Sequence, residues 1–322
     1  MKDNVPAKAH NASDLVVVLL ATFNGSRYLQ QQLESIAEQS HSNWKLLVAD
    51  DGSRDHTLAI VRNFAEYHPG RVCIVPGDPT GSARDNFFRL LRAAGPAPYF
   101  AFCDQDDVWS ADKLERLTRE CRQIQTLHPD RPCLVYSDLS VVDAQLGLVN
   151  PSFINQIRAR PCEITHKTLL AENAIPGCAM LFNAALADLF RANAFDATKA
   201  IMHDWWLALL ASAVGRISHV PDPLVKYRQH ATNTLGSVNR SGLRFVLSKL
   251  FQGDRSEALH TYTQAGAFLD TYGDLLEPAL REEIRVFASL NHRRKLMRVI
   301  LLLRHGSLKQ SLSRRVYQLL RA

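Results

Sequence analysis

The stretch Phe100-Ala-Phe-Cys-Asp-Gln-Asp-Asp-Val-Trp109 joins a short apolar run to a dense group of acids. The run Tyr99–Cys103 has the length of a short buried strand. Three carboxylates follow it within four positions, those of Asp104, Asp106 and Asp107. Because like charges repel one another, this cluster favours a bound cation, and oxygen ligands select Mg²⁺ or Mn²⁺ over Zn²⁺. The alternative is a solvated acidic turn that caps a helix beginning near Asp112.

Two similar units precede this stretch. Leu15–Ala21 is continuously apolar and β-branched, which is typical of a strand buried on both faces of a parallel sheet, and it ends in Thr22-Phe-Asn-Gly25. Trp44–Ala49 is a second such run that ends in Asp50-Asp-Gly-Ser53, and a third short strand is predicted at Val72–Val75. Helical patterns follow these strands, with apolar faces at Leu29, Leu33 and Ile36, at Leu58, Val61 and Phe64, and over Asn86–Ala94.

The alternation of strands and helices predicts an α/β fold with a parallel, doubly wound sheet and right-handed crossovers. Ligands of such sheets bind outside the carboxyl ends of the strands, so Thr22–Asn24, Asp50–Asp51 and Asp104–Asp107 are expected on one rim. No Gly-x-Gly-x-x-Gly follows the first strand and the chain has no Gly-Lys-Ser/Thr loop. These absences argue against dinucleotide binding and P-loop chemistry.

Beyond Asp107 the alternation ends. The remaining strand and helix candidates are Leu134–Tyr136, Leu139–Val142, a tight turn with a strand over Ala174–Phe182, a helix over Met202–Leu210, Ile217–Val220 and Leu224–His230. From Ser241 onward the pattern is helical. We therefore predict an N-terminal tail (1–14), an α/β domain (15–236) and a basic helical extension (237–322).

Composition is that of a globular protein, with 46% hydrophobic and 22% charged residues among 322. Six cysteines without a Cys-x-x-Cys pair are expected to be buried thiols in a reducing compartment. The first fifteen residues lack an apolar core, and no stretch reaches the roughly 18 apolar residues of a membrane span. We therefore expect a cytoplasmic protein without a signal peptide.

The net charge of +6 is concentrated near the end of the chain. From Arg240 onward there are 15 Lys and Arg against 7 Asp and Glu. No basic patch interleaved with aromatic residues is present, so nucleic acid is not an expected partner.

Five motifs resemble glycosyltransferase family 2: Ala21–Gly25, Asp50–Asp55, Cys103–Trp109, His203–Trp206 and Tyr227–His230. That family has the GT-A fold, with a Rossmann-like, mostly parallel sheet, and inverts the anomeric centre. The motifs Asp-Gln-Asp-Asp-Val-Trp and Tyr-Arg-Gln-His-x-x-Asn are similar to motifs of bacterial rhamnosyltransferases of O-antigen and rhamnan assembly. The resemblance covers about 15–236.

The resemblance implies a role for each acid. Asp104 and Asp106 form an Asp-x-Asp motif for Mg²⁺ or Mn²⁺, with Asp106 as the direct ligand and Asp104 nearer the donor ribose or a metal-bound water. Asp107 supports the site or contacts the donor sugar. The cation would act as a Lewis acid on the departing diphosphate.

The resemblance also implies a donor pocket made of Thr22, Asn24, Asp50, Asp51, Arg84, Asn86 and Trp109. Asp50 and Asp51 compete for the carboxylate that reads the pyrimidine edge, and Asp50 is alternatively a plain turn residue. Arg84 is alternatively a solvated charge. Trp109 either walls the donor or packs against the following helix.

Asp204 is the implied general base, which takes the proton of the acceptor hydroxyl as that oxygen attacks from the face opposite the diphosphate. The alternative is an N-cap of the helix that follows. Arg228 and His230 are implied to contact the diphosphate, since guanidinium groups bind phosphate oxygens in pairs, while His230 could also ligate the metal.

The resulting expectation is transfer of one sugar, L-rhamnose from its dTDP donor, to a lipid-linked or oligosaccharide acceptor. The alternatives are a UDP-hexose donor, a sugar-phosphate nucleotidyltransferase and a non-catalytic nucleotide-binding protein. The basic, apolar segment Asn291–His305 is either an amphipathic helix in peripheral contact with the anionic cytoplasmic face of the inner membrane or a packing helix.

Overall fold

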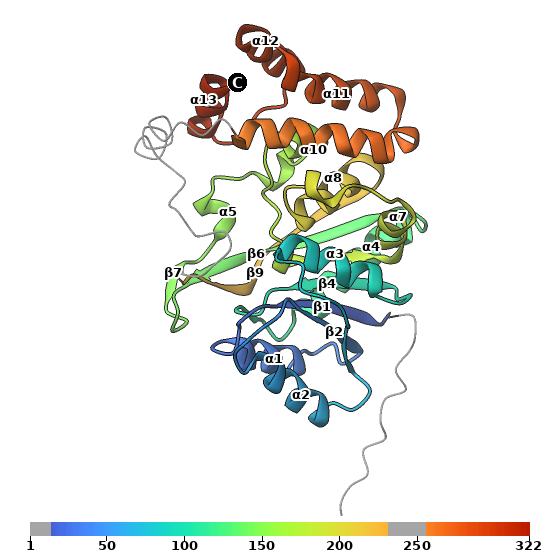
Figure 1. Cartoon of the computed structure of the whole chain (residues 1–322), viewed down its shortest axis with the longest axis vertical. Coiled ribbons are helices and arrows are strands. Elements are labelled where there is room, and N and C mark those ends of the chain that lie inside the picture. Colours follow the sequence, from blue (N-terminus) through green and yellow to red (C-terminus); the bar gives the residue numbers. More distant parts are fainter. Residues whose placement is uncertain (1–13, 231–255) are drawn as a thin grey trace, which may run out of the picture.

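A computed structural model describes residues 14–230 and 256–322, and a nine-stranded mixed sheet lies at its centre (Figure 1). The strand order is β3-β2-β1-β4-β8-β6-β9-β5, and β7 pairs with β6. The strands are β1 (Val16–Thr22), β2 (Trp44–Asp50), β3 (Val72–Ile74), β4 (Tyr99–Cys103), β5 (Val108–Trp109), β6 (Cys133–Val142), β7 (Leu148–Asn150), β8 (Met180–Asn183) and β9 (Arg216–Arg228).

The first four strands are parallel, as predicted. They are connected by α1 (Leu29–Ala37), α2 (Thr57–Tyr67) and α3 (Ala83–Ala93). In the register of the sheet Thr22 lies opposite Asp50, and Leu20 lies opposite Cys103. The polar residues that follow β1, β2 and β4 therefore emerge at one edge, which confirms the predicted rim.

The second half of the sheet was predicted less well, because three strands pair antiparallel. Strand β8 lies antiparallel between β4 and β6, while β5 and β7 pair antiparallel with β9 and β6. Strands β6 and β9 form one long parallel pair whose register shifts near Asp138 and Pro223. The sequence predicted two short strands in place of β6 and two in place of β9. The pairing is irregular around a proline, which lacks an N–H, and this interrupts the apolar pattern without ending the strand.

Two apolar cores cover the two faces of the sheet. Along β1, Val17 and Leu19 belong to one core and Val18 and Leu20 to the other, as the two-residue period of a strand requires. The covering helices include α4 (Lys113–Leu127), α5 (Phe153–Gln156), α6 (His166–Ala171), α7 (Ala184–Ala192) and α8 (His203–Val214).

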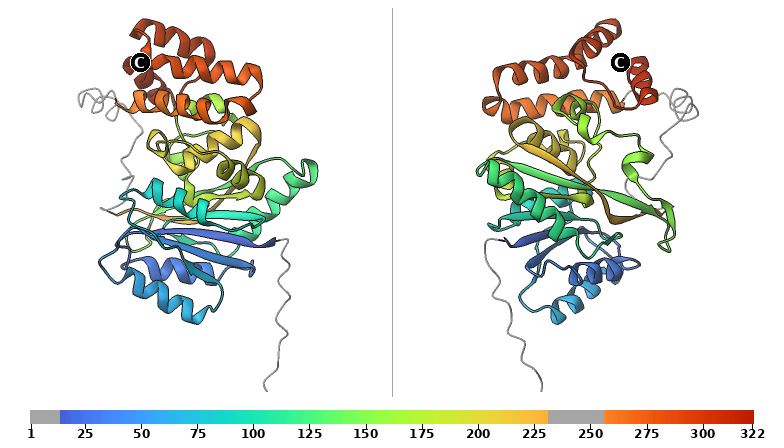
Figure 2. Two further views of the ribbon diagram at one scale, coloured as in Figure 1. Left: turned by 45° about the vertical axis from the view of Figure 1, so that its right-hand side comes forward. Right: turned by 180° about the vertical axis from the view of Figure 1, so that it is seen from behind.

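The C-terminal helices are α10 (Ser256–Tyr272), α11 (Pro278–Ser289), α12 (Lys295–His305) and α13 (Leu312–Arg321). Figure 2 shows them gathered at the end of the molecule opposite α1 and α2. Trp206 of α8 contacts the rings of Phe268 and Tyr272 on α10, so this layer continues the core of the α/β part. The predicted boundary at 236 lies outside the described residues, and the division into domains stays a prediction.

Two further expectations concern the whole chain. Within residues 14–230 and 256–322, none of the helices has both the length and the apolar character to cross a bilayer. The six cysteines are free thiols, four of them buried, but Cys73 and Cys162 are exposed. The expectation of burial is wrong for these two because one lies on the edge strand β3 and the other in a surface turn at 161–163.

Candidate active site

The ends of β1 and β4 are joined by one side chain at the rim. The Gln105 amide accepts a hydrogen bond from Phe23 N and donates one to Phe23 O, both at 2.9 Å. Gly25 makes this approach possible, since a Cβ there would lie 2.1 Å from Gln105 Oε1. The loops after the first and fourth strands therefore have a fixed relation to each other.

The Asp50 carboxylate lies between β1 and the turn that follows β2. It accepts hydrogen bonds from Thr22 Oγ1 at 2.8 Å, from Ser53 N at 2.8 Å and from Ser53 Oγ at 2.6 Å. Asn24, at φ 46°, connects the same turns through Ser53 Oγ and Arg54 N. The turn function considered for Asp50 is thus observed, and its contact with a nucleotide base stays a prediction.

Asp51 and Asn86 stabilise the loops beside this turn. Asp51 accepts hydrogen bonds from the backbone N–H and the hydroxyl of Thr80. Asn86 is buried and donates to Ala49 O at 2.8 Å, which ties α3 to the end of β2. Both residues lie at the predicted rim, and their direct contact with a donor is untested.

Arg84 is not a solvated charge. Its guanidinium forms a two-point ion pair with Asp85, with both N–O distances 2.9 Å, and donates to Ala200 O at 2.8 Å. It therefore joins α3 to the segment that leads into α8. Its predicted role beside the donor remains a prediction.

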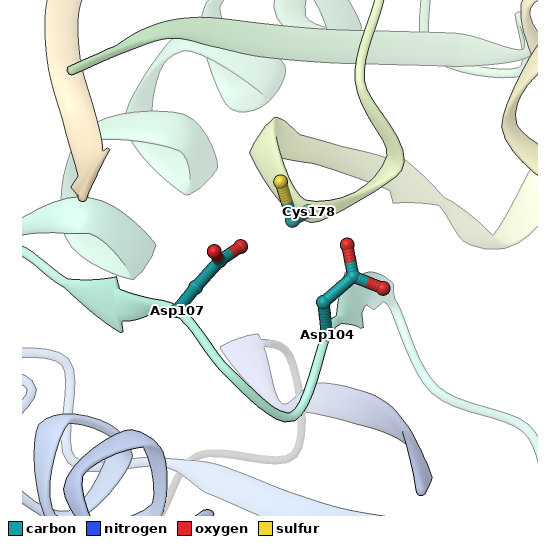
Figure 3. Close-up of side chains that lie close together, drawn as sticks. All are labelled: Asp104, Asp107 and Cys178. Carbon is teal, nitrogen blue, oxygen red and sulfur yellow. The ribbon is translucent and has the colours of Figure 1, made fainter. Parts of the chain in front are cut away.

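Asp104 and Asp107 stand at the two ends of the loop after β4, and Cys178 faces them from a turn at Gly177–Ala179 (Figure 3). Their ligand atoms all lie within 4.8 Å of one another. Asp107 is fully buried; its Oδ1 accepts from Arg228 N at 3.0 Å, while Oδ2 has no hydrogen-bond partner among the described residues. Burial, followed by the charge of Asp106, raises the pKa of Asp104 to about 7 and holds that of Asp107 well above its usual range.

A buried lysine lies beneath these acids. Lys113 Nζ donates to Cys178 O at 2.6 Å and lies 3.3 Å from the centre of the Trp109 ring. Burial lowers the pKa of Lys113 to about 8. Trp109 is buried, so the structure shows the packing alternative for this residue; a role as a wall of the donor pocket is untested.

Asp106 is held by the end of β9. Its Oδ2 lies 2.8 Å from His230 Nε2, and its backbone O accepts from Arg228 Nε at 2.7 Å. Arg228 is buried and also donates to Ala144 O at 2.6 Å and to Gln31 Oε1 at 2.7 Å. The guanidinium thus braces the acidic loop, and the predicted contacts of Arg228 and His230 with a diphosphate stay predictions.

Asp204 lies in the first turn of α8, whose N-cap is Met202, so the N-cap alternative for Asp204 is wrong. Its carboxylate accepts hydrogen bonds from Gly177 N at 3.0 Å and from Trp205 N at 2.6 Å. Burial raises the pKa of Asp204 to about 6, and its charge in turn raises that of Asp104. A buried carboxylate beside the acidic loop with a near-neutral pKa has the properties of a general base.

Comparison with known sequences tests this interpretation. Residues 17–133 match the family model described as "Glycosyl transferase family 2". Residues 17–133 of the chain belong to glycosyltransferase family 2.

Two relatives of this family 2 glycosyltransferase extend the match. The dTDP-rhamnosyl transferase RfbG of Shigella flexneri is 27% identical over 68% of this chain and 74% of its own length. The glucosyltransferase WfgD of Escherichia coli, described as using UDP-Glc and a GlcNAc-diphosphoundecaprenol acceptor, is 24% identical over 86% of this chain and 92% of its own.

Solved structures share the fold of the family 2 chain. S. aureus TarS in complex with UDP-GlcNAc matches 86% of this chain and 72% of its own with a TM-score of 0.55 at 17% identity. The mannosyltransferase PcManGT from Pyrobaculum calidifontis, in complex with GDP-Man and Mn²⁺, matches 91% of this chain and 73% of its own with a TM-score of 0.50 at 17% identity. The expected GT-A fold and C-terminal helices are confirmed.

Several residues of this glycosyltransferase site were not found from the sequence. The sequence predicts Cys178 only as a buried thiol, and it predicts no role for Lys113, which follows the expected helix start near Asp112. Their burial depends on the η3 turn at Gly177–Ala179, which lies within the predicted turn and strand over Ala174–Phe182, but its position beside the acidic loop is not predicted by the sequence. The sequence Pro176-Gly177 was the available signal for that turn.

His203 positions Asp204 through packing. Its ring lies 3.9 Å from that of Phe87 and 4.7 Å from that of Phe102, measured between centroids. Burial lowers the pKa of His203 to about 3, so the imidazole is neutral at physiological pH. The described contacts of His203 are thus those of a packing residue, and a pKa this low makes its imidazole a weak base.

Gly177→Ala is expected to reduce the free energy of unfolding by about 1 to 3 kcal/mol in urea titrations, because the added methyl meets a packed site. Its Cβ would lie 2.8 Å from His203 Nε2 and 3.3 Å from Asp204 Cβ. The matched control is Gly266→Ala in α10, where the new Cβ is 3.9 Å from its nearest neighbour and alanine favours the helix. Equal stability of the two variants would contradict close packing at Gly177.

Proposed function

We propose that this chain transfers a single sugar from a nucleotide-sugar donor to an acceptor hydroxyl, with inversion at the anomeric carbon and with help from a divalent cation. The observation that carries the proposal is that one turn links Asp204 to the acidic loop, because Gly177 N donates to Asp204 and the neighbouring Cys178 groups with Asp104. One buried carboxylate can take the acceptor proton while the loop beside it holds the departing diphosphate. Three strand ends supply the rest of the pocket.

The cation would be Mg²⁺ or Mn²⁺. The residues fit such an ion because the carboxylates of Asp104 and Asp107 have oxygens within 4.8 Å of each other, and Asp107 Oδ2 is buried without a hydrogen-bond partner in the described part of the chain. Asp106 and Asp104 would hold it, with His230 beside Asp106. A bound divalent ion supplies Lewis-acid stabilisation of the leaving diphosphate. The complex of PcManGT with Mn²⁺ supports this choice of metal.

We propose Asp204 as the base, and the backbone around it supports this role. Gly177 N and Trp205 N orient its carboxylate, and burial keeps its pKa near neutrality, where proton transfer is most effective. Thr22, Asn24, Asp50 and Asp51, together with Arg84, Asn86 and Trp109, would form or support the nucleotide pocket. Arg228 and His230 would complete it over the diphosphate.

The donor we favour is dTDP-L-rhamnose, as the similarity to RfbG suggests. A UDP-glucose donor is the second candidate, because WfgD matches more of this chain. The name of WfgD also supports a lipid-linked acceptor, a saccharide joined to a lipid through a diphosphate. We assign these steps to residues 15–236 and regard 237–322 as an extension that serves them.

A thermal-shift panel of nucleotide-sugars with Mg²⁺ or Mn²⁺ tests the donor. A ligand at about 100 times its Kd is expected to stabilise the protein by about 2.7 kcal/mol. We expect the largest shift with dTDP-L-rhamnose, a smaller one with UDP-glucose and none with dTDP-L-rhamnose when EDTA is present. A larger shift with UDP-glucose would favour the second candidate. If no nucleotide-sugar shifts the transition with either cation, the proposed function is wrong.

A further inference from the structure

Helix α12 exposes an apolar stripe on its outer face. Leu296, Ile300 and Leu303 lie within one helical stripe and are 74%, 47% and 55% exposed. The opposite face is occupied, since Leu302 is buried in the core. Three large apolar side chains on one face therefore have no cover within the described residues.

Helix α13 repeats this pattern. Leu312, Val316 and Leu320 follow a four-residue spacing and are 74%, 44% and 46% exposed, whereas Tyr317 is buried on the inner side. Lys295 Nζ at the start of α12 donates to Leu320 O at the end of α13, at 2.8 Å. The two stripes thus belong to neighbouring helices, which lie together at the end of the molecule (Figure 2).

The charge around the stripes has one sign. Residues 291–322 contain nine Lys and Arg and not one Asp or Glu. Arg293, Arg294 and Arg304 are exposed beside the α12 stripe. The inner side is fixed to the rest of the protein through Arg314, which lies 2.6 Å from the buried carboxylate of Glu172. The surface left outside is apolar and cationic.

We propose that α12 and α13 form an interfacial surface that docks on an anionic lipid bilayer, with the stripes among the headgroups and the basic side chains on the lipid phosphates. Helices that lie in a bilayer surface combine an apolar face with flanking Lys and Arg in this way. This docking proposal rests on the proposed function at one point only: a lipid-linked acceptor would require the enzyme to act at a membrane surface.

A second copy of the chain fits this surface less well than a bilayer does. A twofold contact places the same patch on both partners, so it would bring the exposed cations Arg293, Arg294 and Arg304 of one copy near those of the other, without an acid in 291–322 to offset them. Anionic lipids instead complement the charge and accept apolar side chains of any arrangement. Salt is expected to weaken the binding, because the cations are exposed.

Vesicle flotation of the full chain tests the proposal, with phosphatidylcholine vesicles that contain or lack phosphatidylglycerol. The triple variant Leu296→Asp, Ile300→Asp, Leu303→Asp is expected to lower partitioning onto anionic vesicles by at least about tenfold. The variant Arg293→Glu, Arg294→Glu, Arg304→Glu should do the same, since each cation contributes about fivefold. The wild type should bind neutral vesicles weakly.

Matched controls place the same changes elsewhere. Tyr67→Asp with Leu127→Asp replaces side chains that are both 76% exposed, and Lys45→Glu, Arg62→Glu, Arg119→Glu reverses exposed charges on the α/β part. These controls should bind like the wild type. Wild-type failure to float with anionic vesicles, unchanged binding of the α12 variants, or a dimer that these variants dissolve would overturn the proposal. Donor-induced thermal shifts in the same variants are expected to stay unchanged, which separates this test from that of the proposed function.

Discussion

Asp204→Asn is expected to lower turnover by about 10² to 10⁴, the span usual for a lost general base, with donor affinity unchanged. The amide keeps the size of the carboxyl and its oxygen can still accept from Gly177 N, while its NH2 group loses the hydrogen bond that Trp205 N donates to the carboxylate. Steady-state kinetics with a saturating donor measure the turnover, and titration calorimetry measures donor affinity. Near-normal turnover would assign the base to another residue.

The same substitution is expected to stabilise the fold at neutral pH. Burial raises the pKa of Asp204 from 3.8 to about 6, so the folded protein binds this proton more tightly than the unfolded chain. Ionising Asp204 in the folded protein lowers the free energy of unfolding. This loss is absent below about pH 4 and grows between about pH 4 and 6. Above that range it amounts to about 3 kcal/mol. Asn carries no such penalty, so its gain in urea titrations should appear at pH 8 and vanish near pH 4.

The wild-type rate should follow the same ionisation. A base acts when deprotonated, so turnover should rise with pH through about 6 and then level off. The exposed Asp130 supplies a control: Asp130→Asn should change neither the rate nor its pH dependence. The range from pH 5 to 8 extends about one unit or more on each side of the pKa. A turnover that stays constant over this range would contradict Asp204 as the titrating base.

Asp106→Ala is expected to abolish transfer and the cation-dependent part of nucleotide binding. The substitution removes a carboxylate that lies against His230 and whose charge raises the pKa of Asp104. Calorimetric titration of dTDP or UDP, with Mn²⁺ and with EDTA, measures the loss. Unchanged nucleotide affinity with Mn²⁺ would refute Asp106 as a ligand.

Asp107→Ala should be measured together with Asp106→Ala, because the two variants distinguish two positions for the cation. In the structure Asp107 has a buried oxygen without a hydrogen-bond partner among the described residues, and Asp107, not Asp106, groups with Asp104 and Cys178. If Asp107→Ala alone removes the effect of Mn²⁺, the cation is held deeper in the loop than the sequence motif implies. If Asp106→Ala alone removes it, Asp107 serves as a buried support for Arg228.

Strands buried on both faces were predictable because their apolar runs are continuous and their ends are polar. This applies to β1, β2 and β4, and the rim followed from them. The reversed strand β8 was not predictable in direction, because a buried parallel and a buried antiparallel strand have the same composition. The pairing of β6 with β9 depends on contacts between residues far apart in the chain.

The candidate site shows the same division. The acids were predictable because three carboxylates follow one apolar run within four positions, and Asp204 was predictable from its motif. The sequence did not predict whether a side chain at the site points toward a ligand or toward neighbouring residues. Arg228 illustrates this, since its partners Gln31 and Ala144 come from other parts of the chain.

The bracing of the acidic loop by Arg228 also orders events during synthesis. Asp107 receives its hydrogen bond from Arg228 N, and Asp106 meets His230, more than 120 residues later in the chain. While the ribosome is still making the intervening segment, the acids of residues 104–107 have neither support. The first four strands can pair as they emerge, but the acidic loop reaches its final shape only after the strand that ends at Arg228 has left the exit tunnel.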